Sequence, residues 1–210
     1  MYKSYIFAGS KFYFNTPDKL KYSMRKITLL IVALVSLSSA TAQIRIGKAI
    51  LPYEETRGDV TLKLNGAGMR EMLWIDLYAG GLYLQNKNKD PKAILDLDET
   101  MSIKLNIVSG FVTQSKMIKA VQDGFEKATF GNTKPLEERI NKFINFFNEP
   151  IVKNDIFDIV YVKDVGVKAY KNGKELGLVE GRDFKYALFK IWLGDEPASQ
   201  GIKDGMLGLQ

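Results

Sequence analysis

The spacing of apolar residues changes repeatedly along the chain, and the order of these changes restricts the fold class. Segments with alternating apolar and polar residues, which predict strands, are 60–64, 102–108, 157–162, 166–171 and 174–179, and the long aromatic segment 73–84 also predicts a strand. Segments with helical spacing, which predict helices, are one after the N-cap Thr113, one after Pro135, 183–192 and 198–207. Strands, then helices, then strands, then helices predicts an α+β fold with a mainly antiparallel sheet.

Glycines predict where the strands turn or bend. Asn172-Gly173 separates two alternating segments and predicts a two-residue hairpin. The stretch 65–68, Asn-Gly-Ala-Gly, also predicts a turn, because it lacks the third glycine of a dinucleotide fingerprint and the Gly-Lys-Ser/Thr ending of a phosphate loop. Gly80-Gly81, inside a predicted strand, indicates a bend or a close approach of another backbone.

The 210 residues include no cysteine and no histidine. This composition excludes thiol nucleophiles, imidazole acid–base catalysis and the usual zinc sites. Acidic residues such as Asp155 and Asp158 do not have the spacing of a metal site. The sequence therefore predicts no metal and no cofactor, and any chemistry must come from Arg, Lys, Tyr, carboxylates or hydroxyls.

The N-terminal part has the pattern of an export signal. Arg25 and Lys26 precede a short apolar run over 27–37, and Ala40-Thr41-Ala42 has the small residues of a cleavage site. The run is about half the ~20 residues that span a bilayer as a helix. We expect a signal peptide over 24–42, an upstream extension with a mis-assigned start over 1–23, and one domain over 43–210. The expected location is the periplasm or the medium, with no stable transmembrane segment after cleavage.

Removal of residues 1–42 also changes the charge. The full chain has 30 basic and 24 acidic residues, and six of the basic residues and one acidic residue lie before Gln43. The remaining chain has a net charge of +1. A nucleic-acid partner, which requires a basic surface, is therefore not expected.

Arg70 is the main candidate for a functional side chain. Its planar guanidinium can bind a carboxylate in a bidentate way, whereas the alternative is a solvated surface charge. Tyr78 and Tyr83 lie on the following strand and should face opposite sides unless a bulge intervenes. The three lysines of the first helix (Lys116, Lys119 and Lys127) should form its solvated face, and Trp74 and Trp192 should line the core.

Three stretches carry a resemblance to a known family. They are "LNGAGMRE" (64–71), "LYAGGLYL" (77–84) and "ALFKIWLGDEP" (187–197). In this order they resemble the chalcone isomerase-like proteins, in their bacterial exported branch. The resemblance covers about 65–208 and implies an open-faced β-sandwich, with helices layered on a large antiparallel sheet and a ligand cleft between them.

The resemblance also implies site residues. In the plant enzymes, an arginine assists cyclisation of chalcones together with a strand Thr, a Tyr and a late Thr or Ser. The matching positions here are Arg70, Tyr78, Lys116 and Ile191. Because only the arginine is kept, chalcone cyclisation is not expected.

Non-catalytic members of the family that bind fatty acids hold the carboxylate with an arginine and a tyrosine, and Arg70 with Tyr78 resembles that pair. The expected function is thus a non-catalytic protein that binds a fatty acid or a similar amphipathic carboxylate in a cleft, with Arg70, Tyr78, Lys116 and Ile191 in contact with the ligand. Two alternatives remain at this point. One is an intramolecular lyase or isomerase acting on an enone or phenolic substrate, and the other is a structural module with an empty cleft.

Overall fold

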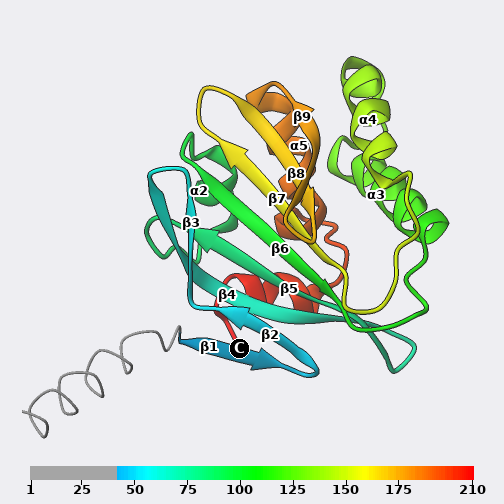
Figure 1. Cartoon of the computed structure of the whole chain (residues 1–210). Coiled ribbons are helices and arrows are strands. Elements are labelled where there is room, and N and C mark those ends of the chain that lie inside the picture. Colours follow the sequence, from blue (N-terminus) through cyan, green and yellow to red (C-terminus); the bar gives the residue numbers. More distant parts are fainter. Residues whose placement is uncertain (1–41) are drawn as a thin grey trace, which may run out of the picture. The chain divides into compact units, whose positions relative to one another are not determined.

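A seven-stranded antiparallel sheet with strand order β3-β4-β5-β6-β7-β8-β9 is the centre of the fold (Figure 1). The structure, a computed structural model, describes residues 42–210. The upstream extension and nearly all of the expected signal peptide lie outside the described residues. The sheet strands are β3 (Glu54–Arg57), β4 (Val60–Met72), β5 (Ile75–Leu84), β6 (Met101–Ile107), β7 (Ile156–Val162), β8 (Gly166–Lys171) and β9 (Lys174–Val179). A separate hairpin consists of β1 (Gln43–Ile46) and β2 (Ala49–Pro52).

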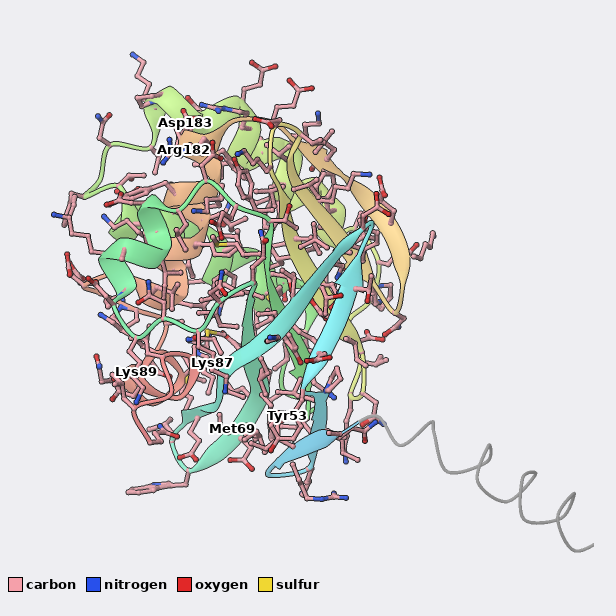
Figure 2. The ribbon with its side chains drawn as sticks, turned by 90° about the vertical axis from the view of Figure 1, so that its left-hand side faces the viewer. Tyr53, Met69, Lys87, Lys89, Arg182 and Asp183 are labelled. Carbon is pink, nitrogen blue, oxygen red and sulfur yellow. The ribbon has the colours of Figure 1, made fainter. Side chains whose placement is uncertain are left out.

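Helices cover one face of the sheet (Figures 1 and 2). They are α2 (Pro91–Asp96), α3 (Gln114–Ala128), α4 (Glu137–Ile144), α5 (Arg182–Leu193) and α6 (Gln200–Met206), with short 3-10 turns at Lys134–Leu136 and Asn145–Phe147. The main core lies between these helices and the sheet, and includes the rings of Phe125, Phe143 and Phe184. A smaller cluster of Leu62, Leu64 and Tyr83 lies on the opposite face. The predicted α+β fold with a large antiparallel sheet and layered helices is confirmed.

Several local predictions are also confirmed. Thr113 caps α3 by accepting a hydrogen bond from the Lys116 backbone N–H, and Asn172-Gly173 connects β8 to β9 with φ of 51° and 82°. Tyr78 belongs to the helix-side core, whereas Tyr83 lies on the other face and donates from its hydroxyl to the Pro52 carbonyl at 2.9 Å. The alternation rule for the two tyrosines therefore holds.

The turn predicted at 65–68 is wrong, because these residues lie inside β4. Their glycines serve a close helix contact instead. A Cβ added at Gly66 would lie 2.2 Å from the Gly205 carbonyl oxygen, and one added at Gly68 would lie 2.8 Å from the Gly201 carbonyl oxygen. Helix α6 therefore packs directly on the backbone of β4, which larger residues would prevent. At Gly80 the close neighbours are side chains of α6, Met206 and Ile202, and not the backbone that was predicted.

The β4–β5 turn lies later, at Leu73-Trp74, so the predicted strand over 73–84 begins two residues too early. Both residues have positive φ, 48° and 68°, in a two-residue hairpin. Trp74 is 98% exposed, so its predicted place in the core is wrong, whereas Trp192 is buried as predicted. The sequence analysis also missed the short strands β1 to β3 and helix α2.

Candidate functional site

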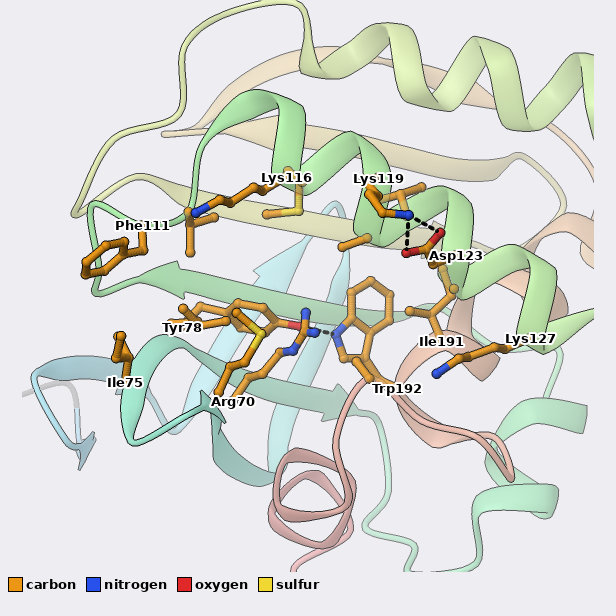
Figure 3. Close-up of a pocket in the computed structure, with 18 of the residues that line it drawn as sticks. Arg70, Ile75, Tyr78, Phe111, Lys116, Lys119, Asp123, Lys127, Ile191 and Trp192 are labelled. Atoms are coloured by element: carbon orange, nitrogen blue, oxygen red, sulfur yellow. Dashed lines mark hydrogen bonds and ion pairs between the residues drawn. The ribbon is translucent and has the colours of Figure 1, made fainter.

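A cavity of about 550 Å³ lies between the sheet and helices α3 and α5 (Figure 3). Strands β4 and β5 form its floor, α3 forms one wall, and Ile191 and Trp192 of α5 close its end. Most of the lining is apolar, and the volume is in the usual range of small-molecule sites.

Arg70 points into this cavity because of a bulge in β4. The register between β4 and β5 shifts between Leu64 and Gly66. Before the shift, Leu62 and Leu64 face away from the helices, and after it Gly66 and Gly68 face α6. Side chains alternate along a strand, so without the shift Arg70 would share the face of Leu64. The bulge thus places the guanidinium on the helix side.

Arg70 and Tyr78 are directly paired across the two strands. The Arg70 Cζ lies 5.8 Å from the centre of the Tyr78 ring. Among the described residues, the Arg70 Nε is the one buried side-chain nitrogen or oxygen without a hydrogen-bond partner. A buried donor without an acceptor destabilises a protein by about 1–3 kcal/mol. Arg70 therefore lines the cavity with a guanidinium whose Nε has no acceptor within residues 42–210.

Trp192 orients the hydroxyl of Tyr78. The indole Nε1 donates to the Tyr78 Oη at 3.1 Å, and both side chains are buried. This bond uses the phenol oxygen as an acceptor, which leaves the phenol hydrogen available as a donor. Figure 3 shows the end of the Arg70 side chain next to this pair of groups. The guanidinium N–H groups of Arg70 and the phenol O–H of Tyr78 can therefore donate together to one acceptor group in the cavity.

Exposed charged side chains surround the opening. Lys116 lies with its Nζ 5.6 Å from the centre of the Phe111 ring, and Lys119 pairs with Asp123 at 3.0 Å. Four cationic and two acidic side chains line the cavity in total. The predicted solvated face of α3 is therefore exposed, and it also forms the cavity rim.

All four residues predicted for the site, Arg70, Tyr78, Lys116 and Ile191, line this one cavity. Lys116 is at the rim and Ile191 is in the wall, where its side chain lies against Gly124. Two further contributors, Trp192 and Phe111, were missed. Trp192 follows Ile191 in the stretch that carries the resemblance, and an indole N–H needs an acceptor when buried, which was the available clue.

Residues 42–210 contain no candidate for a metal site or for a membrane-spanning helix. No group of three or more acidic, His or Cys side chains in that range could hold a metal ion. The helices of the same range are too short or too polar to cross a bilayer.

The sheet, its helical layer and the cavity between them define an open-faced β-sandwich with space for a small ligand. The family model described as chalcone isomerase-like matches residues 43–208, and the chain therefore belongs to the chalcone isomerase-like family. A crystal structure of a fatty-acid binding protein of Arabidopsis thaliana is similar, with a TM-score of 0.64 and 18% identity, over 79% of this chain and 96% of that protein. No curated protein matches the chain in sequence.

Proposed function

We propose that the cavity binds a fatty acid or a similar amphipathic carboxylate, with its head group on Arg70 and Tyr78. The observation that carries this proposal is the pairing of Arg70 with Tyr78 in the lining of the cavity, together with an Arg70 Nε that has no acceptor within the described residues. A carboxylate supplies two acceptor oxygens, enough for the guanidinium and the phenol together.

The rest of the cavity suits an acyl chain. Leu77, Met117 and Val121 are among the apolar residues that line it. Each CH₂ group that leaves water for such surroundings contributes about 0.8 kcal/mol. The excess of cations at the lining favours an anionic ligand over a neutral one. The similarity to the Arabidopsis protein, whose name records fatty-acid binding, also supports this ligand class.

Displacement of a fluorescent fatty-acid analogue tests the proposal. Charge-assisted hydrogen bonds contribute about 1.5–3 kcal/mol, so Arg70→Ala should weaken binding about 10- to 100-fold. Arg45→Ala is the matched control, because Arg45 is exposed on β1 and does not line the cavity. Native mass spectrometry should find acyl carboxylates in the wild-type protein. Equal affinity of Arg70→Ala and wild type would refute the assignment.

The isomerase alternative predicts a different result. In that case Arg70 would stabilise an oxyanion, and Tyr78 or Lys116 would transfer a proton. Turnover over a panel of enones and phenols, lost in Arg70→Ala, would favour an enzyme over passive binding.

We also propose export of the protein, with cleavage after Ala42. The basic residues, apolar run and small residues at 24–42 support it. N-terminal sequencing of the exported form should begin at Gln43, and recovery of residues 1–23 in that form would contradict it.

A further inference from the structure

Large apolar side chains project into solvent at the β4–β5 turn. Leu73 is 82% exposed and Trp74 98%, and they are flanked by Met72 at 50%. Phe111, at 59%, lies on the neighbouring loop, and Figure 3 shows it on the same side of the cavity as Ile75. We call these residues, Met72 to Ile75 with Phe111, the hairpin tip. Contiguous exposed apolar surface of this kind marks an interaction site.

The backbone conformation of the β4–β5 turn is unfavourable for the residues that occupy it. Two-residue hairpins with positive φ at both central positions favour Asn-Gly. The chain uses Asn172-Gly173 in this way between β8 and β9. At the β4–β5 turn it instead has Leu73 and Trp74 in the left-handed region, where bulky residues are strained. The backbone strain and the exposure of the apolar side chains both lower the stability of the protein. The two residues are therefore expected to serve an interaction with another molecule.

The hairpin tip is continuous with the cavity. Met72, Ile75 and Phe111 are each exposed and also line the cavity. Lys116 lies beside Phe111 at the rim. An apolar path therefore leads from the most exposed large apolar side chains, Leu73 and Trp74, to the floor of the cavity, with a cation beside it.

We propose that the hairpin tip docks the protein on a lipid bilayer, with the cavity opening towards the membrane surface. Tryptophan favours the interface between headgroups and acyl chains, and Leu73 beside it can enter the acyl region. Lys116 is placed to contact lipid phosphates. Because Glu71 and Asp76 flank the turn, docking depends on apolar insertion more than on charge.

The size of the tip favours a bilayer over a protein partner. A stable protein interface uses about 20–30 residues on each side. The five side chains of the hairpin tip are too few for that, whereas they are enough for shallow insertion into lipid. Docking does not depend on the identity of the cavity ligand, so the two proposals can fail separately.

Flotation with vesicles of mixed phosphatidylcholine and phosphatidylglycerol tests the proposal. The protein used is residues 43–210, which contain every described element and its core, so that the apolar run at 27–37 does not contribute. The decisive variant is Leu73→Asn/Trp74→Gly, which copies the β8–β9 turn and should raise the midpoint of thermal unfolding. Loss of binding in this variant therefore cannot come from misfolding.

The wild-type protein should float with the vesicles, and the double variant should partition at least about tenfold more weakly. Trp74→Phe should retain most of the binding, and should remove the blue shift of fluorescence that vesicles cause in the wild type. No flotation of the wild type, or equal flotation of the double variant, would overturn the proposal. So would a wild-type dimer in solution that the double variant abolishes, since the tip would then bind a second copy.

Fatty-acid affinity in vesicle-free buffer separates docking from ligand binding. The double variant should keep wild-type affinity for the fluorescent analogue. If it lost soluble binding together with flotation, Leu73 and Trp74 would act in ligand binding, and the docking proposal would be wrong.

Discussion

The contact between β4 and α6 predicts opposite effects for the same substitution at two glycines of one helix. A Cβ added at Gly205 would lie 2.4 Å from the Gly68 Cα and 2.6 Å from the Ala67 carbonyl oxygen, both backbone atoms. At Gly201 the nearest atom is the Met69 carbonyl oxygen at 3.8 Å, an ordinary contact. Gly205→Ala must therefore push the helix away from the sheet, whereas Gly201→Ala fits without any movement.

The two substitutions should change the free energy of unfolding in opposite directions. Overpacking destabilises by about 1–3 kcal/mol, and the upper end applies to Gly205→Ala because backbone on both sides blocks relaxation. Gly201→Ala should stabilise by up to about 1 kcal/mol through helix propensity. In a domain of this size the two midpoints of thermal unfolding should differ by about 10 °C. Calorimetry of both variants measures the difference, and equal midpoints would refute the close contact that positions β4 under α6.

Three further predictions concern other side chains. Tyr78→Phe removes the acceptor of Trp192 Nε1 and the phenol donor, and should weaken fatty-acid binding about tenfold in the displacement assay. Leu73→Asn/Trp74→Gly relieves the strained turn and should stabilise the protein by about 1–2 kcal/mol in urea unfolding. Burial, with repulsion from Arg182, lowers the pKa of Lys185 from 10.5 to about 8. The unfolded chain binds more protons in this window, so wild-type stability should rise from about pH 8 to 10.5, and Lys185→Met should lack that rise.

The order of strands and helices was predictable because most elements have a one-sided apolar pattern. Helix α3, with its Thr113 cap, and the Asn172-Gly173 hairpin follow directly from local rules. The short strands β1 to β3 have too few residues for a pattern to be recognised. Helix α2 has only six residues, and its cap is completed by tertiary contacts of Lys185 with its last carbonyls.

The glycine-rich stretch was misinterpreted because its glycines act through a partner far along the chain. Gly66 and Gly68 contact α6, which lies more than 130 residues later in the chain. Rules based on neighbouring residues cannot predict a contact at that separation. The true turn at Leu73-Trp74 was missed because both residues are atypical for it. The place of Arg70 beside Tyr78 in the cavity came from the family resemblance, since strand alternation alone does not include the bulge that orients the arginine.

Calorimetric titration of a fatty acid and of the fatty alcohol with the same chain length, into wild type and Arg70→Ala, tests the central proposal most directly. The acid and the alcohol share the acyl contacts and differ in the carboxylate. The account predicts that Arg70→Ala weakens binding of the acid by about 10- to 100-fold and leaves the alcohol nearly unchanged. An equal loss for both ligands, or no loss for the acid, would contradict a carboxylate site at Arg70.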